Sequence, residues 1–191
     1  NLDEAKEEEI DASLAAIITH ELQERAVLKC LLMYGLLPMD ETNNETVAQF
    51  IFKALEDFQF DNSELDKLFL LYKEWYESGL EPTEKTFVYY PDEMLNRLVI
   101  SLLEFPYELS PKWESLIQNK KVSEIEQSLN DSRLSVNYFK LRKLKQMLSQ
   151  NQQELEKETS QETQIQLMQL HLDLKNFERE ITKQLGTVIL K

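Results

Sequence analysis

The sequence is poor in glycine, proline, cysteine and histidine. Its 191 residues include three Gly, five Pro, one Cys and two His. So few turn-forming residues disfavour a fold built from many short strands and tight turns, whereas the abundant Leu, Glu, Lys and Gln favour helix. A single cysteine, Cys30, excludes an internal disulfide and fits a reducing compartment. There is no apolar run of about 18 residues that could cross a membrane, and no signal-peptide pattern. We therefore expect a cytoplasmic protein without a membrane partner.

Residue patterns that carry chemistry are also lacking. The two histidines, His20 and His171, have no neighbours at metal-ligand spacing, which argues against a metal site. The glycines are isolated from one another, so none belongs to a phosphate-binding loop. Cys30 lies on an apolar helix face, where a small buried hydrophobe is a better interpretation than a nucleophile. We expect no catalytic residue, cofactor or metal, and hence no enzyme activity in this chain. Because it begins at Asn1 rather than Met, we also expect a fragment of a longer protein.

Charge is unevenly distributed along the chain, whose formal net charge is −14. Residues 1–110 carry 24 acidic and 8 basic side chains, whereas residues 111–191 carry 11 acidic and 13 basic ones. The acidic front part argues against binding a phosphate backbone and keeps the chain soluble. One basic cluster with interleaved aromatics could touch nucleic acid, but it is too small to outweigh the alternative of ordinary surface charge, so direct nucleic-acid binding is not expected. The cluster is Arg133, Lys140, Arg142, Lys143 and Lys145.

The hydrophobic pattern predicts an all-α fold, a compact multi-helix bundle followed by a long antiparallel helical hairpin. Residues 1–18 form an acidic linker or a frayed helix, 19–131 the bundle, and 132–191 the hairpin. The first three bundle helices are predicted from Thr19 to Gly35, over 45–58, and from a cap at 61–63 to a stop at Ser78-Gly79. A fourth runs from Pro91 to before Pro106, and a fifth starts at Ser110-Pro111. A short sixth helix covers 122–129 and is followed by a cap at 130–132. Residues 86–90 have strand chemistry without a partner strand and are interpreted as an extended connector.

Two seven-residue apolar repeats predict the hairpin. Its turn is residues 158–162, where Thr159 and Glu162 have the spacing of a capping box. Asn151 lies on the stripe of the first helix, where it could fix the register or rotate into water. The predicted hairpin core is Leu134, Leu141, Leu144, Leu148, Leu155, Leu167, Leu170, Leu174, Phe177 and Ile181.

Four apolar residues fall beside these stripes: Met147, Ile165, Met168 and Leu172. Methionine adapts to varied partner surfaces, so the set is a candidate docking patch on the outer face of the hairpin. The alternative is that some of the four pack on the bundle. We favour docking for the set as a whole.

Three segments resemble the C-terminal region of bacterial replicative DNA primases of the DnaG type, in a Bacteroidetes-like form. The segment from Glu21 to Gly35 is similar to the first helix of that region. The segment from Asn137 to Leu144 is similar to the start of its long helix. The segment from Leu174 to Gly186 is similar to its closing helix, and the resemblance covers about residues 20–191.

The resemblance implies a helicase-binding domain. In that family the bundle is similar in fold to the N-terminal domain of the hexameric replicative helicase. The hairpin docks on those helicase domains, recruits primase to the replication fork for primer synthesis and modulates helicase activity. The zinc-binding and polymerase domains of such primases have no counterpart in this sequence. We therefore expect a monomeric, non-catalytic docking domain. The alternatives are a structural coiled-coil module that self-associates through the hairpin stripes, and an enzyme built on a helical bundle, which we expect least.

Overall fold

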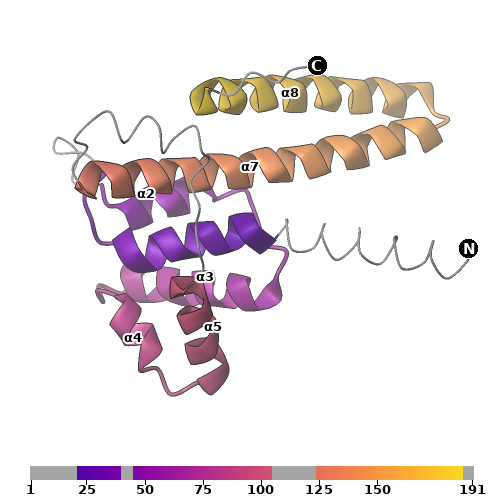
Figure 1. Cartoon of the computed structure of the whole chain (residues 1–191). Coiled ribbons are helices and arrows are strands. Elements are labelled where there is room, and N and C mark those ends of the chain that lie inside the picture. Colours follow the sequence, from indigo (N-terminus) through magenta and orange to yellow (C-terminus); the bar gives the residue numbers. More distant parts are fainter. Residues whose placement is uncertain (1–20, 40–44, 105–123, 187–191) are drawn as a thin grey trace, which may run out of the picture. The chain divides into compact units, whose positions relative to one another are not determined.

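The computed structural model of the chain describes residues 21–39, 45–104 and 124–186, most of which lie in helices (Figure 1). The chain divides into two compact units, Asn1–Ser135 and Val136–Lys191. The predicted all-α class is confirmed. The predicted boundary at residue 131 lies slightly before this division. The expected linker over 1–18, the helix starting at Ser110-Pro111 and the cap at Thr19 lie outside the described residues.

The first described helix covers residues 21–34 and provides much of the core of the first unit. Its apolar side chains Ala26, Val27, Leu28 and Leu31 are almost completely buried. Glu24 is also buried, at 2% exposure. Its carboxylate accepts hydrogen bonds from the backbone amides of Asp61, at 2.5 Å, and Asn62, at 3.1 Å. This buried acid therefore fixes the connection that leads into α3.

Helices α2 (Val47–Ala54) and α3 (Ser63–Glu77) start at side-chain caps. Thr46 and Gln49 form a capping box at α2, and the Asn62 side chain accepts hydrogen bonds from two amides of α3. These local bonds satisfy amides that lack partners within the helix. The predicted caps at 61–63 and the stop at Ser78-Gly79 are confirmed, since Ser78 is the C-cap and Gly79 has φ of 83°. Helix α2 is shorter than the predicted 45–58.

Residues 86–90 do not form the predicted extended connector. Most of them lie in a short helix, α4 (Glu84–Val88), which begins at Thr83 with a capping box to Thr86. Phe87 is fully buried and stacks on Tyr72 and Trp75, with ring centroids 5.7 and 5.0 Å apart. The aromatic residues that favour a strand in isolation are used here for tertiary packing, which overrides their local preference.

Gly35 follows the first helix and is required by a close approach rather than by a left-handed backbone. A Cβ at this position would lie 2.1 Å from the Tyr72 hydroxyl oxygen and 2.4 Å from the Leu31 carbonyl oxygen. The Gly35 carbonyl accepts a hydrogen bond from the Ala48 amide at 2.9 Å. Glycine therefore allows the first helix, α2 and α3 to meet at one point.

Helix α5 (Glu93–Leu103), capped by Asp92, ends before Pro106 as predicted, with Glu104 as its C-cap. The long helix α7 (Glu124–Lys157) has no break at the predicted 130–132 cap. Ser132 and Ser135 donate their hydroxyl protons to the carbonyl oxygens four residues earlier, at 2.9 and 2.7 Å. This bonding satisfies the serine hydroxyls inside a helix, so they do not act as caps. One helix therefore replaces the predicted short helix over 122–129 and the start of the hairpin.

Candidate docking surface

The second unit is an antiparallel hairpin made by α7 from Val136 onward and α8 (Gln161–Leu185) (Figure 1). The predicted turn is confirmed in place but is shorter than 158–162, since α8 already begins at Gln161, and the predicted capping box is not formed. Ser160 is the N-cap, and the Glu158 carboxylate accepts hydrogen bonds from the amides of Thr159 and Ser160, both at 2.8 Å. Glu158 thus accepts from the Thr159 amide, which the predicted capping box assigned to Glu162, and from the Ser160 amide as well.

A polar layer crosses the hairpin seam at Asn151, which is 3% exposed. Its side-chain nitrogen donates to the Leu167 carbonyl oxygen at 3.2 Å, and its side-chain oxygen lies 3.2 Å from Nδ1 of His171. Because that oxygen can only accept, Nδ1 of His171 is the donor. Of the two possibilities for Asn151, the buried one is observed. Asn151 thus bonds to two residues of α8 that are four positions apart.

The rotation of α8 separates the predicted core residues into buried and exposed sets. Leu144, Leu148, Leu174 and Ile181 are buried as predicted, and Leu134, also buried, belongs to the first unit. Three others are half-buried: Leu141, Leu155 and Leu167.

Leu170 and Phe177 are not core residues, since they are 45% and 56% exposed. They precede His171 and Glu178 by one residue, a step of about 100° around a helix. His171 bonds to Asn151, and seven residues further along α8 Glu178 is buried instead of Phe177, with its carboxylate 2.8 Å from Lys175 Nζ. The apolar repeat was therefore wrong in assigning Leu170 and Phe177 to the buried side of α8.

The outer face of α8 carries three exposed apolar side chains in one row. Ile165, Met168 and Leu172 are 61%, 56% and 58% exposed, and their spacing of three and four residues places them on a common face. Met147 is also exposed, at 46%, but it belongs to α7. All four predicted docking residues are therefore accessible within their unit, and three of them form a row, which we call the α8 outer row.

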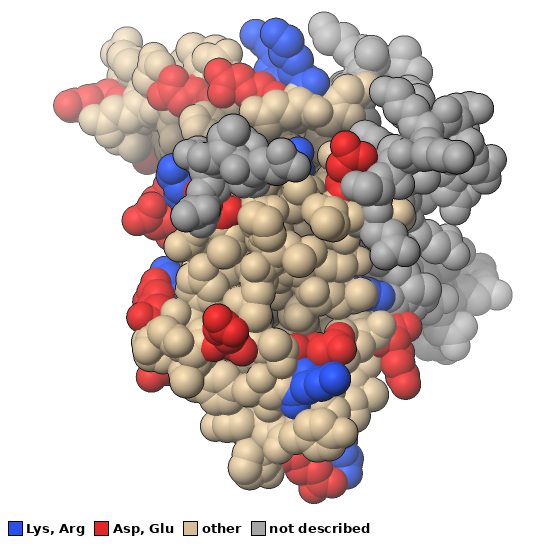
Figure 2. Space-filling model, turned by 90° about the vertical axis from the view of Figure 1, so that its left-hand side faces the viewer, with Lys and Arg blue, Asp and Glu red and all other residues tan. Residues whose placement is uncertain are grey.

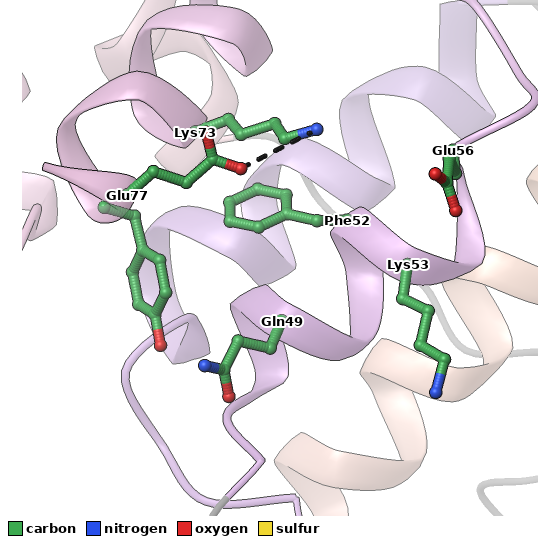
Figure 3. A pocket seen from close by; sticks show the side chains of 7 residues that line it. Gln49, Phe52, Lys53, Glu56, Lys73 and Glu77 are labelled. Atoms are coloured by element: carbon green, nitrogen blue, oxygen red, sulfur yellow. Dashed lines mark ion pairs between the residues drawn. The ribbon is translucent and has the colours of Figure 1, made fainter.

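A hollow of about 550 Å³ lies between α2 and α3 in the first unit (Figure 3). Phe52 forms part of its wall, and Lys73 lies over the Phe52 ring with Nζ 5.9 Å from the centroid and 3.9 Å from a Glu77 carboxylate oxygen. This hollow could not be predicted from the sequence, because its residues come from the region of two helices and follow no motif. Its charges, two lysines and two glutamates, largely balance one another. It is lined by Gln49, Phe52, Lys53, Glu56, Lys73, Tyr76 and Glu77.

Polar groups buried between the first helix and the start of α7 are suited to packing rather than to nucleophilic chemistry. The Cys30 sulfur lies 3.3 Å from the Ser135 hydroxyl oxygen, and burial raises the pKa of the Cys30 thiol to about 11. A thiol of this kind stays protonated at neutral pH and is a poor nucleophile. Desolvation also raises the pKa of the Asp131 carboxyl from 3.8 to about 6. The buried environment of Cys30 agrees with its predicted role as a small hydrophobe.

The described residues lack the features of two other classes of site. They contain no cluster of three or more His, Cys, Asp or Glu side chains suited to holding a metal ion. None of the helices they form is long and apolar enough to span a bilayer. On the face drawn in Figure 2, acidic side chains are more widespread than basic ones.

Comparison with known proteins gives a family without an assigned activity. No curated protein and no solved structure matches the chain. One family model, described as a domain of unknown function (DUF8430), matches residues 4–188 and thus nearly the whole sequence. The chain is a member of the DUF8430 family.

Proposed function

We propose that this chain is a non-catalytic docking domain that tethers a DNA primase to its replicative helicase. The observation that carries the proposal is the α8 outer row, whose three apolar side chains are all more than half exposed. Helix faces directed at solvent are normally polar, and an exposed apolar row therefore indicates a surface used for contact. The resemblance of three segments to the helicase-binding region of DnaG-type primases gives the class of partner.

The geometry of the hairpin supports this role. The seam is closed by Leu144, Leu148, Leu174 and Ile181, so these side chains are used for folding. The α8 outer row lies on the opposite side of the same helix, and changes there leave the seam intact. The proposed partner is the N-terminal domain of the hexameric helicase in the bacterial cytoplasm. Recruitment, rather than chemistry, is the proposed contribution of this chain to primer synthesis.

Titration of the chain with the N-terminal domain of the helicase from the same bacterium tests the proposal. The double substitution Met168→Glu and Leu172→Glu places two charges in the α8 outer row. We expect it to weaken binding by at least about 100-fold, because burying each unpaired carboxylate costs several kcal/mol. Circular dichroism and the melting temperature should stay unchanged, because both side chains are exposed.

A matched control adds the same two charges elsewhere on α8. Gln166 and Gln184 are exposed and lie outside the row, so Gln166→Glu with Gln184→Glu should bind like the unchanged chain. Absence of binding by the folded, unchanged chain would overturn the proposal. A collapse of the melting temperature in the Met168 and Leu172 variant would instead show that these residues support the fold.

The second candidate function is a structural module that self-associates through the hairpin. Its basis is the same exposed α8 outer row, together with Leu170 and Phe177. Sedimentation of the purified chain over a wide range of concentrations separates the two. A monomer at every concentration excludes the structural module, whereas a dimer that dissociates in the Met168 and Leu172 variant favours it.

A further inference from the structure

The face of α8 that carries the apolar row continues toward the C-terminus as a row of cations. Lys175, Arg179 and Lys183 follow Leu172 by three, seven and eleven residues, which keeps them on the same side of the helix. Arg179 and Lys183 are exposed, and the Lys175 side chain is 50% exposed. The face is therefore apolar over its first half and basic over its second. The signal for this continuation was present in the spacing, but sequence reasoning did not identify it.

The helix dipole explains only part of this arrangement. Cations are favoured in the last turn of a helix, and Lys183 lies there. Arg179 lies about one and a half turns before the end of α8, where the dipole effect has faded. Lys175 is bound to Glu178, whereas Arg179 and Lys183 have no carboxylate partner in the described part of the chain. These two cations lie on the same face as the exposed apolar residues. The face is therefore electrostatically complementary to a partner that carries negative charge.

We propose that this face binds one amphipathic, acidic helix of the partner. Apolar side chains of that helix would seat on Ile165, Met168 and Leu172. Its carboxylates would lie roughly 10–16 Å further along the axis, against Arg179 and Lys183, as a rise of 1.5 Å per residue requires. This inference rests on the proposed docking function and specifies the chemistry of the partner at the same surface.

A protein helix fits the face better than a nucleic acid does. Phosphates would engage the cations but would leave the three apolar side chains exposed, whereas a helix with both characters covers the whole row. The chain also carries a net charge of −14, which opposes the approach of a polyanion more strongly than that of a helix with two or three carboxylates.

Charge reversal at the basic half of the face tests the proposal. The double variant Arg179→Glu and Lys183→Glu is compared with Lys145→Glu and Lys157→Glu, which changes the net charge equally at exposed lysines of α7. The probe is the helicase N-terminal domain, titrated at low and at high salt. We expect the α8 variant to bind on the order of tenfold or more weakly at low salt, because like charges then face each other. The control variant should bind within about twofold of the unchanged chain, since its charges lie elsewhere.

Neutralisation provides a second measurement. Arg179→Gln with Lys183→Gln should lose most of the salt dependence of binding while the apolar contact remains. Equal affinity and equal salt dependence in the unchanged chain and both α8 variants would overturn the acidic-helix inference and leave the docking function standing. No binding by the unchanged chain would overturn the docking function and this inference with it. Tight binding of a single-stranded oligonucleotide that the Arg179→Glu and Lys183→Glu variant abolishes would instead assign the face to nucleic acid.

Discussion

Single residues help to determine how helices meet in this protein. Two of them, Gly35 and Glu24, are not apolar and so are not identified by the apolar repeat. Gly35 has no side chain because Tyr72 occupies the space, and Glu24 is buried because two backbone amides need an acceptor. Neither role can be inferred from a local pattern, since the partner residues are distant in sequence. Caps such as Asn62 are predictable because the bonds they make reach only two or three residues ahead.

Asp131 gives a prediction at this scale. Its half-buried carboxyl has a pKa raised from 3.8 to about 6 by desolvation, so the folded state binds a proton that the unfolded state releases between these values. The contribution of this group to stability is present below about pH 4 and is lost as the pH rises through about 6. Asp131→Asn should therefore stabilise the protein at pH 7. The shift of about two units corresponds to at most roughly 3 kcal/mol, and solvent screening of a half-buried group reduces this to on the order of 1 kcal/mol.

Urea unfolding of both proteins between pH 4 and pH 8 measures this effect. The difference between the Asn variant and the unchanged chain should be small at pH 4 and grow until about pH 7. The exposed Asp173, changed to Asn, is the matched control for the loss of one carboxylate. A difference that is independent of pH would contradict the assignment of a raised pKa to Asp131.

At the scale of elements, the sequence predicted which segments are helical better than how each helix is turned. The stripes of the hairpin placed Leu144, Leu148, Leu174 and Ile181 correctly. They could not distinguish Leu170 and Phe177 from the polar residues beside them, because the repeat carries no information on bonds to the other helix, such as those of Asn151. The exposed candidate docking residues were predictable as off-stripe positions, but the basic continuation at Arg179 was not predicted.

Asn151 is predicted to specify the pairing of the hairpin at little cost or benefit to stability. Replacing it by Leu removes two bonds across the seam but adds apolar contact, so the free energy of unfolding should stay within about 1 kcal/mol. The expected change is in specificity, because a buried Asn is satisfied in one register and Leu fits several. Sedimentation should then show more self-association than the unchanged chain does. Gln152→Leu, at the exposed neighbouring position, is the matched control. A strictly monomeric Asn151→Leu variant would show that the apolar seam alone fixes the register.

At the scale of the whole molecule, charge is the dominant unexplained feature, and it predicts a response to salt. Residues 1–110 carry a balance of −16, so carboxylates repel one another when the chain is compact. Raising the salt concentration screens this repulsion over about 10 Å and should stabilise the folded state by on the order of 1 kcal/mol. Urea unfolding in low and in near-physiological KCl measures the change, since urea adds no ions of its own. Sucrose at matched osmolality controls for effects of the solute other than screening.

A midpoint that falls on addition of KCl would mean that attractive pairs, such as Glu21 with Arg25, outweigh the repulsion. A rise would show instead that the acidic surface is maintained at a cost in stability, as expected for a surface kept for solubility or for the choice of partner.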